Sequence, residues 1–291
     1  MKDNKIEVKK RSMAGEIWQR LRKNHLAMLG LAILLLLILA AVFADVIADY
    51  DTKVIAQHMS DRLQGPSRAH IFGTDEFGRD IFARLVHGSR VSLVVGVISV
   101  SVSLVLGGFF GAAAGYYGGR VDNIIMRIMD VFLAIPSILL AITIVAALGT
   151  NLFNVMLAIG VSGTPGFARI VRAAVMGVKD QEFVEASRAI GAMNGTIIFR
   201  EIIPNCMAPI IVQSTLSVAS AILSTASLSF IGLGVQPPAP EWGAMLASGR
   251  GFLRDAVHIT LFPGLAIVIT ILALNLLGDG LRDALDPRLK Q

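Results

Sequence analysis

The string GTDEFGRD at residues 73–80 has the glycine spacing of a phosphate-binding loop, and it is the nearest approach to a catalytic motif in this sequence. In such a loop the backbone N–H groups cradle phosphates, a Lys reaches the β- and γ-phosphates, and a Ser or Thr hydroxyl holds Mg²⁺. Here Arg79 and Asp80 occupy the positions of that Lys and hydroxyl, and the acidic side chains of Asp75 and Glu76 would repel an anion. The string therefore predicts no nucleotide site.

Other patterns that could do chemistry are also missing from the sequence. The five histidines show neither an HExxH string nor a paired spacing, and no GxSxG string occurs. The single cysteine, Cys206, excludes a disulfide framework and is expected to be a small buried packing residue. We therefore predict that the chain is not an enzyme, that it has no catalytic residue, and that it binds no metal or other cofactor itself.

The composition indicates that the solvent around this chain is lipid. Of its 291 residues, 54% are hydrophobic and 16% are charged, and the mean hydropathy is +0.68. A soluble domain usually carries about 25% charged residues, so this chain has too little charge to cover a surface that faces water. The net charge of +5 comes from basic residues between the apolar runs, which is a topology signal, and we expect no nucleic-acid partner.

Six apolar segments are long enough to cross a bilayer, which takes roughly 20 residues of helix. They lie at about 26–46, 91–115, 129–148, 153–175, 207–231 and 259–277. The fourth segment is interrupted at residues 162–166, which include Pro165, so it is either one kinked helix or two half-helices. The expected fold is an all-α integral membrane bundle of six transmembrane helices.

Lys and Arg residues indicate the orientation of this bundle. With the N-terminus inside, 18 of the 26 basic residues lie in inner segments and 8 lie in outer segments, which places both termini in the cytoplasm. The first apolar run is too long for a signal peptide and is expected to be retained. The predicted order is a cytoplasmic tail (1–25), a first transmembrane helix (26–46), an extracytoplasmic segment (47–90), a core of five helices (91–277) that includes a cytoplasmic loop (178–205), and a cytoplasmic tail (278–291).

The second span carries a glycine repeat. Gly107, Gly111, Gly115 and Gly119 recur every four residues and should lie along one face of a helix. Small residues let two helix backbones approach closely, which is how helices associate when lipid removes the hydrophobic driving force. The repeat predicts that these four glycines form a tight helix–helix interface.

A few polar or amphipathic residues in or near the spans have more than one possible role. Gln213 and Asn275 lie within spans and are candidates either for lining a pathway or for hydrogen bonds between helices. Asp130 follows Arg127 by three residues, a spacing that predicts an ion pair on one helix face. Trp242, in a proline-rich outer segment, is expected to be an interfacial anchor.

The inner stretch DQEFVEASRAIGAMNGTIIFREIIPN, residues 180–205, predicts two short amphipathic helices that are too polar to cross a membrane. On the first helix, Phe183, Ser187 and Ile190 should share one face, and Gly191 suits the left-handed residue that ends it. From this pattern alone, the element either docks against a partner or lies on the lipid surface.

Part of this stretch resembles the EAA motif of bacterial ABC-importer permeases. Glu185 and Ala186 match the motif, with Ser187 after them. Gly191 follows at the family's spacing, and Ile203-Pro204 closes the segment, with Ile203 in place of the family's Leu and Glu201 in place of its usual Ile. Ser187 departs mildly from the family pattern, which has a second alanine there. In that family the loop is a coupling helix that sits in a groove of the ATPase subunit.

The resemblance implies that the residues coupling this chain to an ATPase are Phe183, Glu185, Ala186, Ser187, Ile190, Gly191 and Pro204. It implies a polar pairing with the ATPase for Glu185, and a close approach and a turn for Ala186 and Gly191. The side chains of Phe183 and Ile190 would supply the apolar packing.

Longer strings extend the resemblance over nearly the whole chain. They are similar to C-subunit permeases of the dipeptide, oligopeptide and nickel type, and they are HIFGTDEFGRDIFARLVHGSRVSL (70–93), GYYGGRVDNIIMRIMD (115–130), LSFIGLGVQPPAPEWGAML (228–246) and NLLGDGLRDALDPRLK (275–290). The resemblance implies a type I importer fold in the bacterial inner membrane. It also implies a complex with a second homologous permease, two ABC ATPases that bind ATP and Mg²⁺, and an extracytoplasmic binding protein.

The function that follows is half of the translocation pathway of an ATP-driven importer of dipeptides or oligopeptides. Nickel, glutathione or another small solute stays open as cargo, because permeases that share these motifs move different cargoes. An ion-coupled secondary transporter would predict midspan carboxylates and an inverted repeat, whereas the middle of each span lacks Asp and Glu. A membrane scaffold that binds a partner through residues 180–205 without transporting anything is a second alternative.

Overall fold

The computed structural model describes residues 13–285, and the remainder of the two predicted tails lies outside that range. The helices are α1 (Met13–Leu21), α2 (His25–Val42), α3 (Ala44–Ile47), α4 (Ile81–Tyr117), α5 (Gly119–Leu133), α6 (Ser137–Leu148), α7 (Leu152–Met176), α8 (Glu182–Ala189), α9 (Asn194–Thr196), α10 (Ile203–Asn205), α11 (Met207–Phe230), α12 (Trp242–Gly249) and α13 (His258–Leu285). Short π-helical segments are Tyr50–Ile55 and Ile197–Ile202, and short 3₁₀ segments are Met59–Asp61 and Arg250–Phe252. The described part of the chain is mostly helical and has no β-strand, as predicted.

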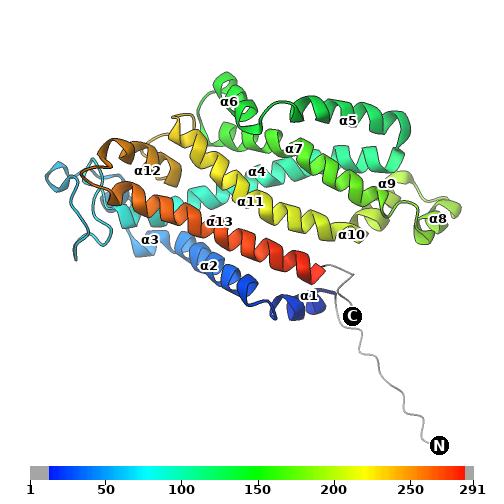
Figure 1. The fold of residues 1–291 in the computed structure, drawn as a ribbon, viewed down its shortest axis with the longest axis horizontal. Helices are drawn as coiled ribbons and strands as arrows, with labels where there is room; N and C mark the ends of the chain where they lie inside the picture. Colours follow the sequence, from blue (N-terminus) through cyan, green and yellow to red (C-terminus); the bar gives the residue numbers. More distant parts are fainter. Residues whose placement is uncertain (1–12, 286–291) are drawn as a thin grey trace, which may run out of the picture.

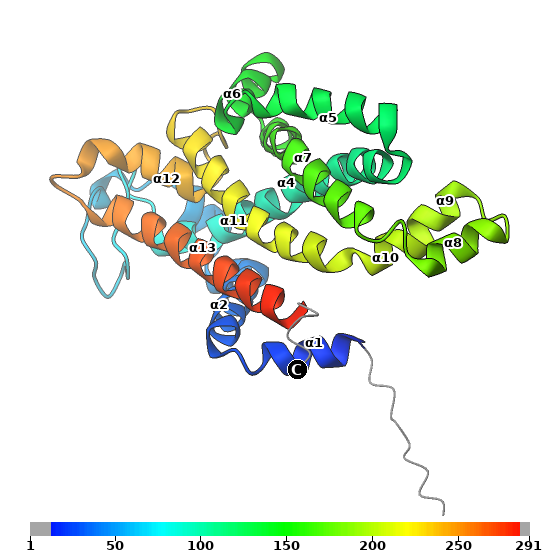
Figure 2. The ribbon, with the colours of Figure 1, turned by 45° about the vertical axis from the view of Figure 1, so that its right-hand side comes forward.

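The long helices lie side by side along the longest axis of the molecule (Figure 1). Figure 1 places α12, α3 and the segment before α4 at one end, and α8 and α9 at the other. We call these the α12 end and the α8 end. In the turned view of Figure 2, α5 and α6 lie on the opposite side of the bundle from α2. Helix α4 is central, because it packs against α7, α11 and α2.

Four helices, α2, α4, α11 and α13, are long and apolar enough to cross a membrane. The predicted third span, 129–148, is instead broken: α5 and α6 pass the same test together, but they are bent by 86°. Pro136 stands directly before α6, where its ring cannot continue the α5 hydrogen-bond ladder. The bundle therefore has four clear spans and one bent pair, in addition to α7.

Helix α7 settles the question that the sequence left open for the fourth span. It is one continuous helix of 25 residues with Pro165 inside it. At about 1.5 Å per residue it is roughly 37 Å long, enough for a hydrocarbon core of about 30 Å. It is not among the helices selected by length and hydropathy, and its middle carries the polar and glycine residues 162–166.

The helix that contains the predicted second span begins earlier in the chain than the predicted span, which starts at residue 91. Helix α4 begins at Ile81, so the end of the expected extracytoplasmic segment is helical. Polar residues in its first turns hid this from hydropathy, but their side chains meet backbone carbonyls: Arg84 Nη1 donates to Val54 O at 2.9 Å, and Arg90 Nε donates to Ala41 O at 3.0 Å. At the other end of the chain, α13 likewise continues past the expected limit of 277, to Leu285.

Helix α2 lies along α13, which follows it by more than 200 residues in the sequence. A Cβ added to Gly30 would lie 2.6 Å from Ala273 O, so the two backbones are in close contact there. Leu34 packs with Ala273 and Leu274 in the same interface. The first and last long helices of the described chain thus form one unit.

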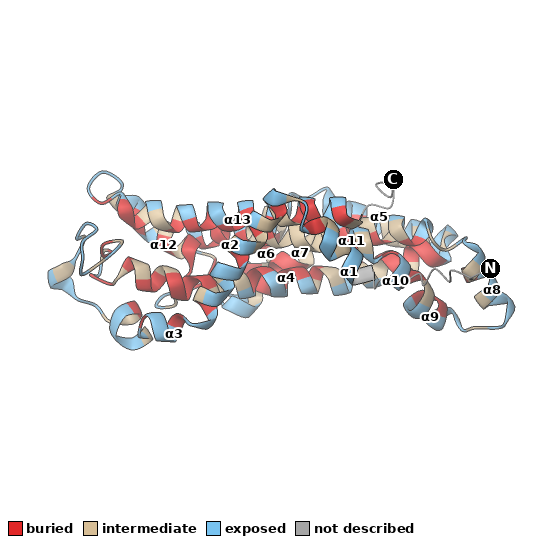
Figure 3. Cartoon of the chain, turned by 90° about the horizontal axis from the view of Figure 1, so that it is seen from below, coloured by how far each residue is buried: buried red, intermediate tan, exposed pale blue. Residues whose placement is uncertain are grey.

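Many large apolar side chains remain exposed on the outside of the bundle. Leu36 and Phe109 are each 67% exposed and Val268 is 60% exposed. Figure 3 shows exposed residues along the outer faces of the long helices, with buried residues between the helices. This pattern is the one expected when lipid covers the outside.

Residues at the α12 end form a buried polar framework above α4. Asp75 Oδ2 accepts a hydrogen bond from Arg79 Nε at 2.6 Å and lies 3.4 Å from Arg84 Nε. Trp242 is fully buried, and its Nε1 donates to Leu85 O at 3.0 Å. The prediction of an interfacial anchor for Trp242 is therefore wrong, because the indole N–H is satisfied inside the fold by the first turns of α4 and does not reach the membrane surface.

Candidate functional site

Three of the four repeated glycines hold α4 against α7. A Cβ on Gly107 would lie 2.6 Å from Thr164 O, and a Cβ on Gly115 would lie 2.9 Å from Arg172 O. Gly111 faces the carbonyl oxygen of Ala168 in the same way. This is the most extensive contact between two elements of the described chain.

Gly119 does not belong to this interface, so that part of the prediction is wrong. Helix α4 ends at Gly118, whose φ of +62° turns the chain, and Gly119 begins α5 with a φ of +53°. A Cβ at Gly119 would meet nothing within 4 Å. The four-residue glycine repeat in the sequence therefore extends past the end of α4.

Ion pairs join α5 to α7 beside this interface. Arg172 donates from Nε and Nη2 to the two carboxylate oxygens of Asp122, at 2.5 and 2.6 Å. Arg169 Nη2 donates to Asp130 Oδ1 at 2.9 Å. The predicted pairing of Asp130 with Arg127 is therefore wrong: α5 packs on α7, so the carboxylate meets a cation of the neighbouring helix.

We expect Asp122→Ala to lower the free energy of unfolding by about 1 kcal/mol, because the pair with Arg172 is bidentate but partly exposed. Exchanging the two charges, Asp122→Arg with Arg172→Asp, should restore part of that loss. Asp130→Ala is the control, since its pair with Arg169 is largely exposed on both sides. Thermal unfolding in detergent measures all of these variants, and equal losses at Asp122 and Asp130 would contradict the expectation.

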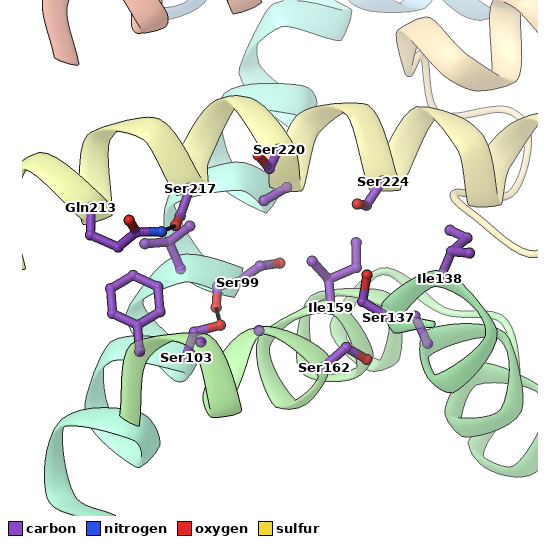
Figure 4. A pocket seen from close by; sticks show the side chains of 16 residues that line it. Ser99, Ser103, Ser137, Ile138, Ile159, Ser162, Gln213, Ser217, Ser220 and Ser224 are labelled. Carbon is purple, nitrogen blue, oxygen red and sulfur yellow. Dashed lines mark hydrogen bonds between the residues drawn. The ribbon is translucent and has the colours of Figure 1, made fainter. Parts of the chain in front are cut away.

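A half-open cavity of about 250 Å³ lies between α4, α6, α7 and α11. Its polar lining residues are Ser99, Ser103, Ser137, Ser162, Gln213, Ser217, Ser220 and Ser224. Four of them lie on α11 at spacings of four, three and four residues, so they form a stripe along one face of that helix. Figure 4 shows this stripe facing α7 and α6 across the cavity.

Several of these polar groups form hydrogen bonds within or between the helices of the wall. Ser103 Oγ donates to Gly160 O on α7 at 2.7 Å. Gln213 Nε2 donates to Ser217 Oγ at 3.0 Å, as Figure 4 shows. None of the lining residues carries a charge. The structure thus brings Gln213 to the cavity, whereas Asn275, the other polar residue predicted near a pathway, is exposed on α13 and does not line it.

The predicted coupling residues lie at the α8 end, which is the extreme of the molecule in Figures 1 and 2. Gly191, with a φ of +80°, supplies the left-handed turn after α8. Phe183 packs against a buried cluster within the chain, whereas Ile190, the residue that follows the last turn of α8, is 84% exposed. The residue of α8 that is fully buried is Val184, whose place in that cluster fixes the helix.

The remaining coupling residues lie on the surface or near it. Glu185, Ala186 and Pro204 are exposed, and Ser187 is half-buried. Glu185 and Ala186 are adjacent on α8, so together they present a polar and a small side chain to anything that docks there.

A second set of contacts fixes this end to α4, and the sequence did not single it out. Tyr116, at the end of α4, donates from its hydroxyl to Asn194 Oδ1 at 2.8 Å. The guanidinium carbon of Arg188 lies 5.2 Å from the centre of the Tyr116 ring. Ile197 and Ile202 are fully buried beside it. These contacts tie α8 and α9 to the end of α4.

Comparison with known proteins bears directly on this arrangement. Residues 107–291 match the family model for a binding-protein-dependent transport system inner membrane component, which is more than half of the chain. This chain is a binding-protein-dependent transport permease. Residues 12–66 of the permease also match the N-terminal transmembrane domain of oligopeptide transport permease C. It is accordingly a multi-pass protein of the inner membrane.

Several curated relatives align with the permease over almost its full length. The dipeptide transport system permease protein DppC of Alkalihalophilus pseudofirmus is 50% identical over 94% of this chain and 90% of its own. The di/tripeptide transport system permease protein DppC of Pseudomonas aeruginosa is 47% identical over 94% of this chain and 92% of its own. The glutathione transport system permease protein GsiD of Escherichia coli O157:H7 is 48% identical over 94% of this chain and 90% of its own.

The fold is similar to that of a solved ABC importer. An inward-facing structure of the MetNI methionine ABC transporter matches with a TM-score of 0.57 and 20% identity, over 70% of this chain and 96% of the other. At that identity the match speaks for the fold alone. The permease therefore has the helical fold of a type I ABC importer permease, as predicted from its sequence.

Proposed function

We propose that this permease forms half of the translocation pathway of an ATP-driven importer of short peptides. The observation that carries the proposal is the identity of 47–50%, over nearly the whole chain, with permeases named for dipeptide, di/tripeptide and glutathione transport. Small peptides are the chemistry common to those names. The uncharged polar cavity between α4, α7 and α11 supports the same assignment, because it can hold a polar solute within an apolar bundle.

In this proposal the two ends of the bundle have separate partners. The α8 end faces the cytoplasm and contacts one of two ATPase subunits, which bind ATP and Mg²⁺. A second homologous permease faces the open side of the cavity and completes the pathway. The α12 end faces outward, where an extracytoplasmic binding protein delivers the peptide. Both termini are then cytoplasmic, in agreement with the distribution of basic residues.

The force path follows from the contacts at the α8 end. When the ATPases close on ATP, they would move α8, through contacts with Glu185 and its neighbours, as a rigid body. Val184 and the turn at Gly191 keep α8 in a fixed relation to the cluster beneath it. Because Tyr116 links that region to α4, the motion would reach the α4–α7 unit that borders the cavity.

The test begins with co-purification of the tagged permease from its native membrane. We expect a second permease and two ATPase subunits to stay bound, and a binding protein to stimulate ATP hydrolysis when it carries a dipeptide such as Ala-Ala. The complex in vesicles should then accumulate Ala-Ala in an ATP-dependent manner. A permease that purifies alone in a detergent known to preserve such complexes, or a complex that moves no peptide, would contradict the proposal.

A further inference from the structure

Two hydroxyls on α4 are buried without a hydrogen-bond partner among the described residues, those of Ser92 and Ser99. Each serine is only 1% exposed. A buried hydroxyl without a partner loses the free energy of its hydrogen bonds to water and gains nothing in return. Such a group finds its partner in a water, in the carbonyl of the preceding helical turn after a rotation of the side chain, or in a ligand.

Only one of these two serines lines the cavity. Ser99 is part of its wall, whereas Ser92, two helical turns earlier on α4, is not. In Figure 4 the hydroxyl of Ser99 points away from Ser103, toward the part of the cavity near Ser220 and Ile159. The neighbouring hydroxyl of Ser103 is already satisfied by Gly160 O. Among the described residues that line the cavity, Ser99 is thus the one whose hydroxyl is buried without a partner.

The chemistry of the residues that line the cavity limits the class of ligand that can bind to Ser99. Eight of the lining residues are polar, seven of them serines and one a glutamine, and none is charged. A hydroxyl both donates and accepts, so a serine wall solvates a peptide N–H, a peptide C=O, an ammonium or a carboxylate equally well. The α11 stripe from Gln213 to Ser224 covers twelve residues of helix, and its ends are roughly 16 Å apart. That is the length of about four or five residues of extended chain.

We propose that this cavity binds the main chain of a short peptide in transit, with Ser99 supplying a hydrogen bond that is fixed in place before the peptide arrives. Because the wall is uncharged, the permease accepts peptides without regard to the net charge of their side chains, and discrimination by charge is left to other subunits. This inference rests on the proposed function. It adds that Ser99 of the permease contacts the main chain of the peptide.

The first experiment compares Ser99→Ala with Ser92→Ala in the complete complex in vesicles, with radiolabelled Ala-Ala as the probe. Removing an unpartnered buried hydroxyl leaves no group unsatisfied, so both variants should fold as well as the parent. We expect Ser99→Ala to lower the uptake rate about three- to tenfold, the value of one hydrogen bond, and Ser92→Ala to leave it unchanged. Equal uptake by the two variants would overturn the role of Ser99.

The second experiment tests the uncharged wall. Ser220 lies on the exposed side of the cavity, so an aspartate there would stay ionised. We expect Ser220→Asp to change the ratio of Ala-Lys to Ala-Glu uptake by about tenfold in favour of Ala-Lys, while Ser220→Asn leaves the parental ratio unchanged. An unchanged ratio in Ser220→Asp would show that cargo does not pass this wall.

The outcomes separate this inference from the proposed function. If the parent complex imports Ala-Ala and all the serine variants have the parental uptake, the proposed importer function is supported and the peptide site in this cavity is contradicted. If the parent complex moves no peptide, the proposed function itself is contradicted. Tagged protein recovered in equal amount from each variant excludes a difference in folding as the cause.

Discussion

Replacing Gly191 by Val should abolish transport while the protein remains inserted in the membrane. Gly191 has a φ of +80°, and a Cβ there would meet nothing within 4 Å, so the cost of the substitution is purely conformational. A left-handed residue with a side chain costs about 1–2 kcal/mol, and more when the side chain is β-branched. The turn is expected to change its backbone angles and to redirect α8, which would break the fixed relation between α8 and α4.

The matched control for this variant is Gly191→Asn, because asparagine adopts the left-handed conformation far more readily. We expect the Asn variant to keep most of the uptake and the ATPase stimulation. Gly195→Ala, at a nearby glycine without positive φ and with no atom within 4 Å, should behave like the parent. If the Val variant has the parental uptake, the turn at Gly191 is not needed for coupling.

Replacing Gly111 by Leu should prevent α4 and α7 from packing and should reduce the folded protein recovered from membranes to a small fraction. The added side chain would meet Ala168 O, and Arg172 N at 3.0 Å, which are backbone atoms of α7 that cannot rotate away. Overpacking in a core typically costs about 1–3 kcal/mol where side chains can adjust. Here the helix axes themselves would have to separate, along the most extensive interface of the fold.

Gly108→Leu is the control for this clash. Gly108 lies three residues before Gly111 on the same helix, and a Cβ there would meet nothing within 4 Å. Both variants carry the same loss of a glycine and the same added apolar surface. The fraction of protein that stays monodisperse in detergent on heating should fall sharply for Gly111→Leu and stay near the parental value for Gly108→Leu. Similar curves for the two would mean that the close approach at Gly111 is dispensable.

The elements that the sequence predicted well are those set by local chemistry. Long uncharged runs gave the cores of α2, α11 and α13, and the four-residue glycine repeat identified the face of α4 that meets α7. Gly191 was recognised because a helix end with a glycine has a specific backbone requirement. In each case the cause lies within a few residues along the chain.

The predictions that were wrong depended on contacts between distant segments. The helical turns of α4 before residue 91 were not predicted, because Arg84 and Arg90 look incompatible with a buried helix until their carbonyl partners are known. Trp242 was assigned to the membrane surface because its acceptor, Leu85 O, is 157 residues away. Asp130 was paired with a neighbour on its own helix because the crossing of α5 over α7 has no local signature.

The cavity could be predicted only in part from the sequence. The spacing of Gln213, Ser217, Ser220 and Ser224 is visible in the sequence as a helical stripe, and it could have been found there. Serine is common in membrane helices, however, because its hydroxyl can bond to the preceding turn of its own helix. Only the packing of α11 against α4 and α7 shows that this stripe borders an empty space and not another helix.

The pairing of α2 with α13 has a consequence for how the protein is made. At about 5–20 residues per second, the segment between Val42 and His258 takes roughly 10–40 s to synthesise. During that time α2 has left the ribosome, and the helix that will cover Gly30 and Leu34 does not yet exist. The face of α2 that will meet α13 must therefore be stable against lipid during that time, while α4, which follows much sooner in the chain, already packs on another face of α2. The 18 residues of α2 carry apolar side chains all around and no acidic or basic group apart from His25 at its end. The sequence of α2 is therefore suited to lipid before α13 is synthesised, and to packing against α13 afterwards.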